Sequence, residues 1–235
     1  MPIEFSASSM QLAGINFLEP SKMSNFQPAL MLPPLTTLEW LQGSPEEFTH
    51  DIQLMLLIQP NCPGCHTEAL PLANKLTETK QAFDLYCIST AFEEFEYNTK
   101  ASAQSLLDGK HVGIPKQRLG ETVEHIPKMP LAYDNVIAKT EAKSEYIAMA
   151  LEATKYITYE QAQELNPSIT IGMIERQIEK MGTDLLPEYI AEIFYKVRAK
   201  GTPTWVVHKS NGEVLDVKFG HLPEKAIVDW IEQYV

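Results

Sequence analysis

The run from Ile52 to Ile58 constrains the fold most, because only Gln53 interrupts its apolar residues. A strand of this kind is typically buried on both faces, as in parallel sheets covered by helices. A second apolar run extends from Phe83 to Ile88, and the residues between the two runs have a helical pattern in which Pro71 predicts a kink. Strand, helix and strand in this order predict a βαβ unit with a right-handed crossover.

The first strand leads directly into the motif Cys62-Pro63-Gly64-Cys65 at the start of the helix. A thiol just before a helix N-terminus meets unpaired N–H groups and the positive end of the helix dipole, which lower its pKa. Cys62 is therefore the expected nucleophile, and Cys65, one turn into the helix, is expected to attack the resulting mixed disulfide. Pro63 suits the first helical turn, and Gly64 allows a partner backbone to approach closely.

Half of a zinc site has the same Cys-x-x-Cys spacing, so two alternatives stay open. One is a metal-binding or metal-delivery protein using Cys62, Cys65 and His66, and the other is a redox-silent binding module. The sequence offers no second pair of ligands with zinc-site spacing, and we therefore expect neither a metal nor a cofactor. Cys87 lies in the second apolar run and is expected to be an inert core thiol. The histidines are His50, His66, His111, His125, His208 and His221.

Charge and hydropathy exclude other classes of function. The formal net charge of -12 argues against binding to a nucleic-acid backbone, which requires a basic surface. No segment reaches the roughly 18 consecutive apolar residues that a membrane span requires. The first ten residues lack a basic stretch followed by an apolar one, as a secretory signal would have. These features predict a soluble cytoplasmic protein.

Two segments carry a resemblance to a known family. Residues Cys62 to Pro71 resemble the Cys-x-x-Cys-x-x-Glu-x-x-Pro signature of TlpA-like thiol–disulfide oxidoreductases, within the thioredoxin-like superfamily. Gly201-Thr202-Pro203-Thr204 is similar to the cis-proline motif of that superfamily. The resemblance implies an α/β fold with a central mixed sheet of four or five strands flanked by helices. It also implies dithiol–disulfide exchange with protein or small-molecule thiols.

The resemblance also implies a substrate site. Thr202 and Pro203 would lie against Cys62, with the Thr202–Pro203 bond cis and the Thr202 backbone pairing with the substrate beside Pro63 and Gly64. Glu68 has two interpretations, as an acid that assists proton transfer to Cys65 or as a solvated helical residue. His66 likewise either tunes the thiolate or is simply exposed, and Asn61 stands where many family members have Trp, so the rim of the site is altered.

The expected domain organisation has three parts. Residues 1–30 form an N-terminal extension, residues 31–96 and 198–235 form the thioredoxin-like domain, and residues 97–197 form a mainly helical insertion. The C-terminal part of the domain is expected to be a hairpin, 204–208 and 214–219, followed by an amphipathic helix. The insertion precedes the cis-proline strand and is the candidate for a lid over the substrate.

Overall fold

The computed structural model describes residues 30–79, 81–138, 163, 168, 170, 172–173 and 189–235. The chain divides into two compact units, of which the larger comprises Ala29–Val136 and Ala191–Val235. The smaller comprises Met1–Pro28 and Ile137–Ile190. The expected N-terminal extension, apart from residue 30, and most of the expected insertion beyond residue 138 lie outside the described residues.

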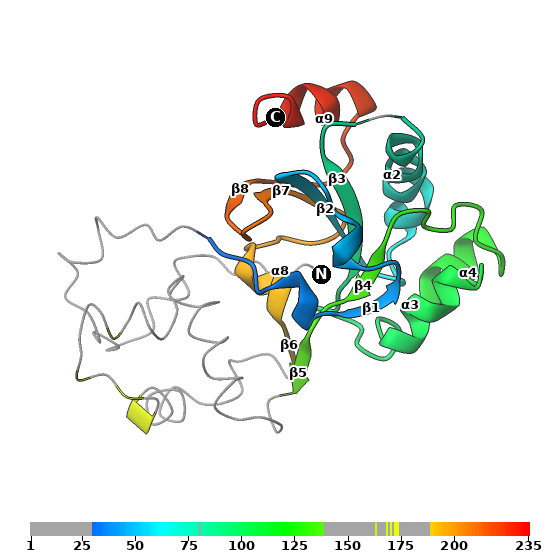
Figure 1. The fold of residues 1–235 in the computed structure, drawn as a ribbon. Helices are drawn as coiled ribbons and strands as arrows, with labels where there is room; N and C mark the ends of the chain where they lie inside the picture. The colour runs from blue at the N-terminus through cyan, green and yellow to red at the C-terminus, as the bar shows by residue number, and fades with distance from the viewer. Residues whose placement is uncertain are drawn as a thin grey trace. The chain divides into compact units, whose positions relative to one another are not determined.

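A six-stranded mixed sheet is the centre of the larger unit (Figure 1). The strand order is β1-β4-β3-β2-β7-β8. Neighbouring strands are parallel in the pairs β2–β3 and β3–β4 and antiparallel in the other three pairs. The strands are β1 (Glu39–Gln42), β2 (Ile52–Ile58), β3 (Asp84–Ser89), β4 (Leu131–Tyr133), β7 (Thr204–Lys209) and β8 (Val214–Phe219). The predicted mixed α/β class is confirmed, with one strand more than the four or five expected.

Strand β2 divides the core into two layers because its alternate side chains point to opposite faces of the sheet. Leu54 and Leu56 pack in one layer with helices α2 (Leu70–Thr77) and α9 (Glu224–Ile231). Met55 and Leu57 pack in the other layer, which includes Ile193 of helix α8 (Glu192–Lys196). All seven residues of β2 are buried, as the apolar run predicts.

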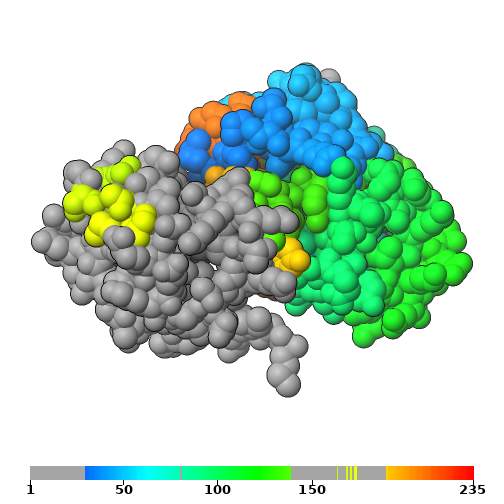
Figure 2. All heavy atoms as spheres, turned by 90° about the horizontal axis from the view of Figure 1, so that it is seen from below, coloured from blue at the N-terminus to red at the C-terminus, as the bar shows by residue number. Residues whose placement is uncertain are grey.

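The segment 97–136 belongs to the larger unit, whereas the sequence placed it in the insertion. It contains helices α3 (Lys100–Leu107) and α4 (Gly113–Leu119) as well as β4, which pairs with both β3 and β1. Figure 2 shows the surface of this segment continuous with that of the preceding part of the chain. Three residues are too few to show an alternating pattern, so β4 has no clear strand signature in the sequence.

Asp134 connects the end of β4 to helix α8. Its buried carboxylate accepts hydrogen bonds from the N–H groups of Ile193 at 2.9 Å and Phe194 at 3.2 Å, and from the Thr90 hydroxyl at 2.7 Å. The two bonds from backbone N–H groups satisfy donors in the first turn of α8 that have no partner within the helix. Between Asp134 and α8 lie the strands β5 (Val136–Ala138) and β6 (Tyr189–Ala191), which form a separate two-stranded sheet.

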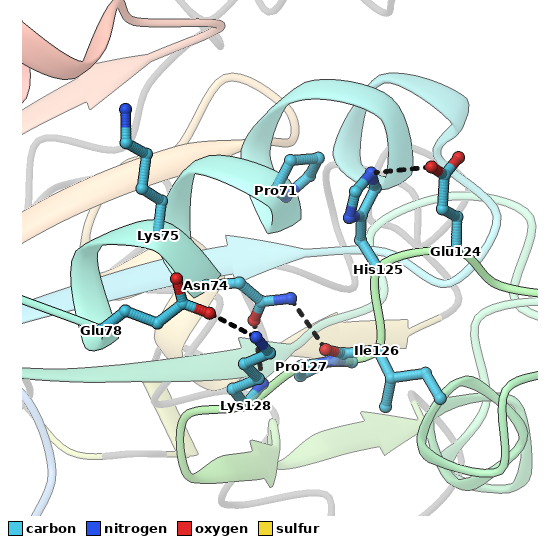
Figure 3. A pocket seen from close by; sticks show the side chains of 9 residues that line it. All are labelled: Pro71, Asn74, Lys75, Glu78, Glu124, His125, Ile126, Pro127 and Lys128. Carbon is cyan, nitrogen blue, oxygen red and sulfur yellow. Dashed lines mark hydrogen bonds and ion pairs between the residues drawn. The ribbon is translucent and has the colours of Figure 1, made fainter.

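A surface pocket of about 380 Å³ lies between α2 and residues 124–128 (Figure 3). Asn74 joins its two sides, because its side-chain amide donates to Ile126 O at 2.8 Å and its oxygen accepts from Lys128 N–H at 2.9 Å. Lys128 also pairs with Glu78. These hydrogen bonds and the ion pair thus connect residues 124–128 to α2. No cysteine lines the pocket.

No helix in the part of the chain that the structure describes has both the length and the apolar character to cross a membrane.

Candidate redox site

The Cys-x-x-Cys motif lies where β2 turns into a helix. A turn brings the N–H of Cys62 to the carbonyl of Gln59 at 3.0 Å, and the next turn is a π-helix, Cys65–Ala69. Pro71 has no N–H with which to continue the regular helical ladder. The π turn, in which the N–H of Leu70 donates to Cys65 O, directly precedes the first turn of α2, which contains Pro71, where the sequence predicted a kink.

The Cys62 sulfur is half-buried and lies among several hydrogen-bonding groups. It accepts the N–H of Cys65 at 3.3 Å, and its thiol donates to Thr202 O at 3.5 Å. The pKa of Cys62 is lowered to about 7, chiefly by a hydrogen bond from the Cys65 thiol and further by the N–H groups of Cys65 and Gly64, against the opposing effect of burial. A large fraction of Cys62 is therefore thiolate near neutral pH.

Cys65 has the opposite environment. Its side chain is fully buried, and burial raises the pKa of its thiol well above the ordinary value, with the adjacent Cys62 raising it further. Both residues are free thiols. The two sulfurs thus differ in exposure and in acidity, and only Cys62 is both accessible and readily ionised.

The segment around Pro203 completes the site from a distant part of the chain. The Thr202–Pro203 peptide bond is cis, and the Thr202 carbonyl faces the Cys62 sulfur. The Thr202 hydroxyl donates to Gln59 Oε1 at 3.2 Å, which joins this segment to the residues just before the motif. The structure therefore brings Thr202 and Pro203 to the motif, where the resemblance placed them.

Glu68 lies on the exposed side of the helix that carries the motif. Its exposed carboxylate pairs with His221 Nδ1 at 3.3 Å, while Cys65 is fully buried. The His221 ring also lies against Gly64, where an added Cβ would be 2.8 Å from ring atoms Cε1 and Nε2. His221 therefore covers one side of the motif, a contact that the sequence did not indicate.

His66 is buried rather than exposed. Its Nε2–H donates to Pro60 O at 2.8 Å, and its ring meets His111 edge-on with 4.7 Å between ring centroids. Burial lowers the pKa of His66 to about 4, despite the opposing hydrogen bond to Pro60, so the ring is neutral at pH 7. An apolar interior disfavours the charged imidazolium, and His66 supplies no positive charge to the neighbouring thiolate.

The residues that the structure describes do not provide enough ligands for a metal centre. No three His, Cys, Asp or Glu side chains among these residues gather in an arrangement that could hold an ion. Of the three candidate ligands, His66 donates Nε2–H to a backbone carbonyl and its Nδ1 has no hydrogen-bond partner among the described residues, but three ligands do not complete a structural zinc site. A tetrahedral structural zinc site requires four protein ligands.

Cys87 lies within β3, is fully buried and has its pKa raised by burial. We expect Cys87→Ala to leave disulfide exchange unchanged and to lower the free energy of unfolding by about 1 kcal/mol, because it removes one buried sulfur atom. Urea unfolding and an insulin-reduction assay measure the two quantities. Loss of turnover with a native circular-dichroism spectrum would place Cys87 in the reaction.

Comparison with known proteins gives matches among solved structures, whereas no family model and no curated protein matches. A thiol-disulfide isomerase from Corynebacterium glutamicum has a TM-score of 0.49 at 16% identity, over 88% of this chain and 94% of that chain. A thioredoxin-like superfamily protein has a TM-score of 0.48 at 14% identity, over 87% and 96%. The exposed lipoprotein thioredoxin of Streptococcus pneumoniae has a TM-score of 0.37 at 9% identity, over 81% and 90%.

The larger unit has the mixed-sheet topology that the sequence resemblance implied. Its parallel pair β2–β3 is joined through the motif and α2, and the antiparallel hairpin β7–β8 lies on the other side of β2. A cis-proline directly precedes β7.

Proposed function

We propose that this protein is a thiol–disulfide oxidoreductase in which Cys62 attacks a substrate disulfide and Cys65 resolves the product. The contrast between the two thiols carries the proposal. Cys62 is partly exposed with a pKa of about 7, and Cys65 is buried with a pKa raised well above its ordinary value. Nucleophilic attack requires a thiolate that the substrate can reach, and Cys62 meets both conditions.

The reaction is a two-electron exchange that needs no cofactor. The Cys62 thiolate attacks one sulfur of the substrate disulfide, a bond forms between these two sulfurs, and the other substrate sulfur leaves as a thiolate. Cys65 then loses its proton and attacks the Cys62 sulfur, which releases the second substrate thiolate. The substrate is reduced to two thiols, and the protein is oxidised to a Cys62–Cys65 disulfide. The reverse sequence oxidises a dithiol substrate.

The environment of Cys65 favours this order of steps. Before the attack, burial is the largest cause of the raised pKa of Cys65, and the hydrogen bond and the negative charge of Cys62 raise it further. Both disappear when Cys62 enters the mixed disulfide, because its sulfur no longer carries a charge. The pKa of Cys65 then falls, and its thiol becomes easier to ionise at the stage at which it must act.

The substrate is proposed to lie beside Thr202 and Pro203, with Pro63 forming the opposite border. At Gly64, where the sequence suggested a close approach by a partner backbone, the His221 ring occupies the adjacent space. The support for this position is the Thr202 carbonyl, which lies 3.5 Å from the Cys62 sulfur. A protein or small-molecule disulfide placed here would meet the one sulfur of the pair that is partly exposed. The signature shared with TlpA-like proteins is consistent with this class of substrate.

An insulin-reduction assay with dithiothreitol tests the proposed function. The protein at catalytic concentration is expected to accelerate precipitation of the insulin B chain, since exchange at Cys62 would be faster than direct reduction by dithiothreitol. A rate equal to that of dithiothreitol alone would refute the proposal. The reduction potential of the Cys62–Cys65 pair, measured by equilibration with glutathione, then distinguishes a reductase from an oxidant.

A further inference from the structure

Asn61, directly before Cys62, is a buried polar residue whose side chain joins two other parts of the chain. Its oxygen accepts the N–H of Ile114 at 2.6 Å, and its amide nitrogen donates to the carboxylate of Glu94. The side chain is almost completely buried, so each of these bonds replaces a bond to water. An unpaired amide in this place would be destabilising.

The contact with α4 is too close to tolerate any side chain at Gly113. A Cβ added there would lie 2.0 Å from Asn61 Oδ1, and Gly113 has a φ of +50°. The asparagine oxygen accepts an N–H group in the first turn of α4, which has no side-chain cap of its own. Asn61 therefore holds the start of this helix against the motif.

The contact with loop 93–98 is double. Besides the side-chain bond to Glu94, the backbone N–H of Asn61 donates to Asn98 Oδ1 at 2.9 Å. Glu94 has a φ of +48°, a conformation that is uncommon for residues with side chains. Its carbonyl accepts the N–H groups of Tyr97 at 2.9 Å and Asn98 at 3.1 Å, so the loop has a defined shape where it meets Asn61.

We propose that Asn61 is a positioning residue for Cys62, which it orients by fastening the motif to loop 93–98 and to the start of α4. The position of the Cys62 sulfur depends on the backbone at residue 61, because the two residues share a peptide unit. The four contacts of Asn61 restrict that backbone and so keep the sulfur within reach of the Cys65 N–H and the Thr202 carbonyl. This inference rests on the proposed function.

The test exchanges the hydrogen-bond donor and acceptor between residues 61 and 94 in the 235-residue chain. Asn61→Ala removes both side-chain bonds, and Asn61→Asp sets a second carboxylate against Glu94. Glu94→Gln is the matched control, since its amide oxygen still accepts from Asn61. In the double variant Asn61→Asp/Glu94→Gln, the glutamine amide donates to the aspartate, which restores the bond with donor and acceptor exchanged and leaves the total charge unchanged.

The main readout is the pH dependence of Cys62 alkylation, followed by mass spectrometry, together with the rate of insulin reduction at pH 7. We expect Asn61→Ala and Asn61→Asp to raise the pKa of Cys62 by roughly 0.5 to 1 and to slow exchange roughly threefold to tenfold. Glu94→Gln is expected to change the rate less than about twofold, and the double variant to recover most of the rate lost in Asn61→Asp.

Two results would overturn the proposal. One is an Asn61→Ala variant that folds and has the wild-type alkylation profile, and the other is a double variant no more active than Asn61→Asp. If Asn61→Ala does not fold, the comparison of Asn61→Asp with the double variant still tests whether Asn61 positions Cys62. Alkylation reports the orientation of Cys62 even if the wild-type protein fails to reduce insulin, so failure of the proposed function is distinguishable from failure of this inference.

Discussion

Replacing Cys62 with serine is expected to abolish disulfide exchange, with a loss of at least about 1,000-fold in the rate of insulin reduction. A serine hydroxyl is not ionised near neutral pH and cannot form the sulfur–sulfur bond. Cys65→Ser should behave differently, because Cys62 can still attack. The mixed disulfide then has no resolving thiol, and we expect substrate to remain covalently attached to Cys62 until an external thiol releases it.

Alkylation of the reduced wild-type protein checks these roles independently of turnover. At mildly acidic pH, iodoacetamide is expected to label Cys62 first, since Cys62 is the more exposed and more acidic thiol. Cys87→Ala provides a control that removes a cysteine without touching the motif. Labelling of Cys65 before Cys62, or covalent capture of substrate by Cys62→Ser, would contradict the assignment.

Acidification is expected to destabilise the fold strongly between pH 6.5 and about pH 4. Burial lowers the pKa of both His66 and His208 to about 4, so these rings stay neutral in the folded protein over a range in which they ionise in the unfolded chain. Their contribution to stability is complete above pH 6.5 and is lost as the pH falls through 4. Each represents on the order of 3 kcal/mol of the free energy of unfolding.

Asp134 acts in the opposite direction. Burial raises its pKa to about 6, so its contribution to stability is complete below its unfolded pKa of 3.8 and is lost as the pH rises through about 6. Through Asp134, acidification therefore raises the free energy of unfolding by an amount similar to that lost through one histidine. The expected net loss between pH 6.5 and 4 is on the order of 3 kcal/mol, measurable by urea unfolding at several pH values.

His208→Gln isolates one of the two histidines. The Tyr86 hydroxyl donates to His208 Nε2 at 2.7 Å, and a glutamine oxygen can accept the same bond without titrating. We expect this variant to flatten the dependence of stability on pH, whereas Asp134→Asn should make it steeper. An acid-induced loss of stability that His208→Gln leaves unchanged would show that His208 is not responsible.

Local patterns in the sequence were sufficient for the elements that form the centre of the molecule. The apolar run of β2 predicts a fully buried strand, and the helix after it places the two cysteines of the motif in different environments. The hairpin β7–β8 follows equally from two strand-forming segments separated by the turn residues Ser210, Asn211 and Gly212. In each of these cases the signal lies within a short stretch of chain, because burial and strand alternation act on neighbouring residues.

Residues 97–136 show where such patterns are insufficient. Strand β4 has three residues, and its place beside β3 depends on pairing with a strand more than 40 residues earlier in the chain. Nothing within residues 131–133 indicates that partner. The boundary between the sheet and the expected insertion could therefore be located only once the strands were paired.

The sequence by itself located the two cysteines of the motif, the βαβ unit around them and the Thr202-Pro203 segment that lies beside Cys62. Tertiary structure alone decided that His66 is buried and neutral, that Glu68 pairs with His221 and that Asn61 joins the motif to two distant segments. The physical reason is that backbone preferences and hydrophobic periodicity act between residues close in sequence. The partner of a polar side chain is instead set by which segments the packed core brings together.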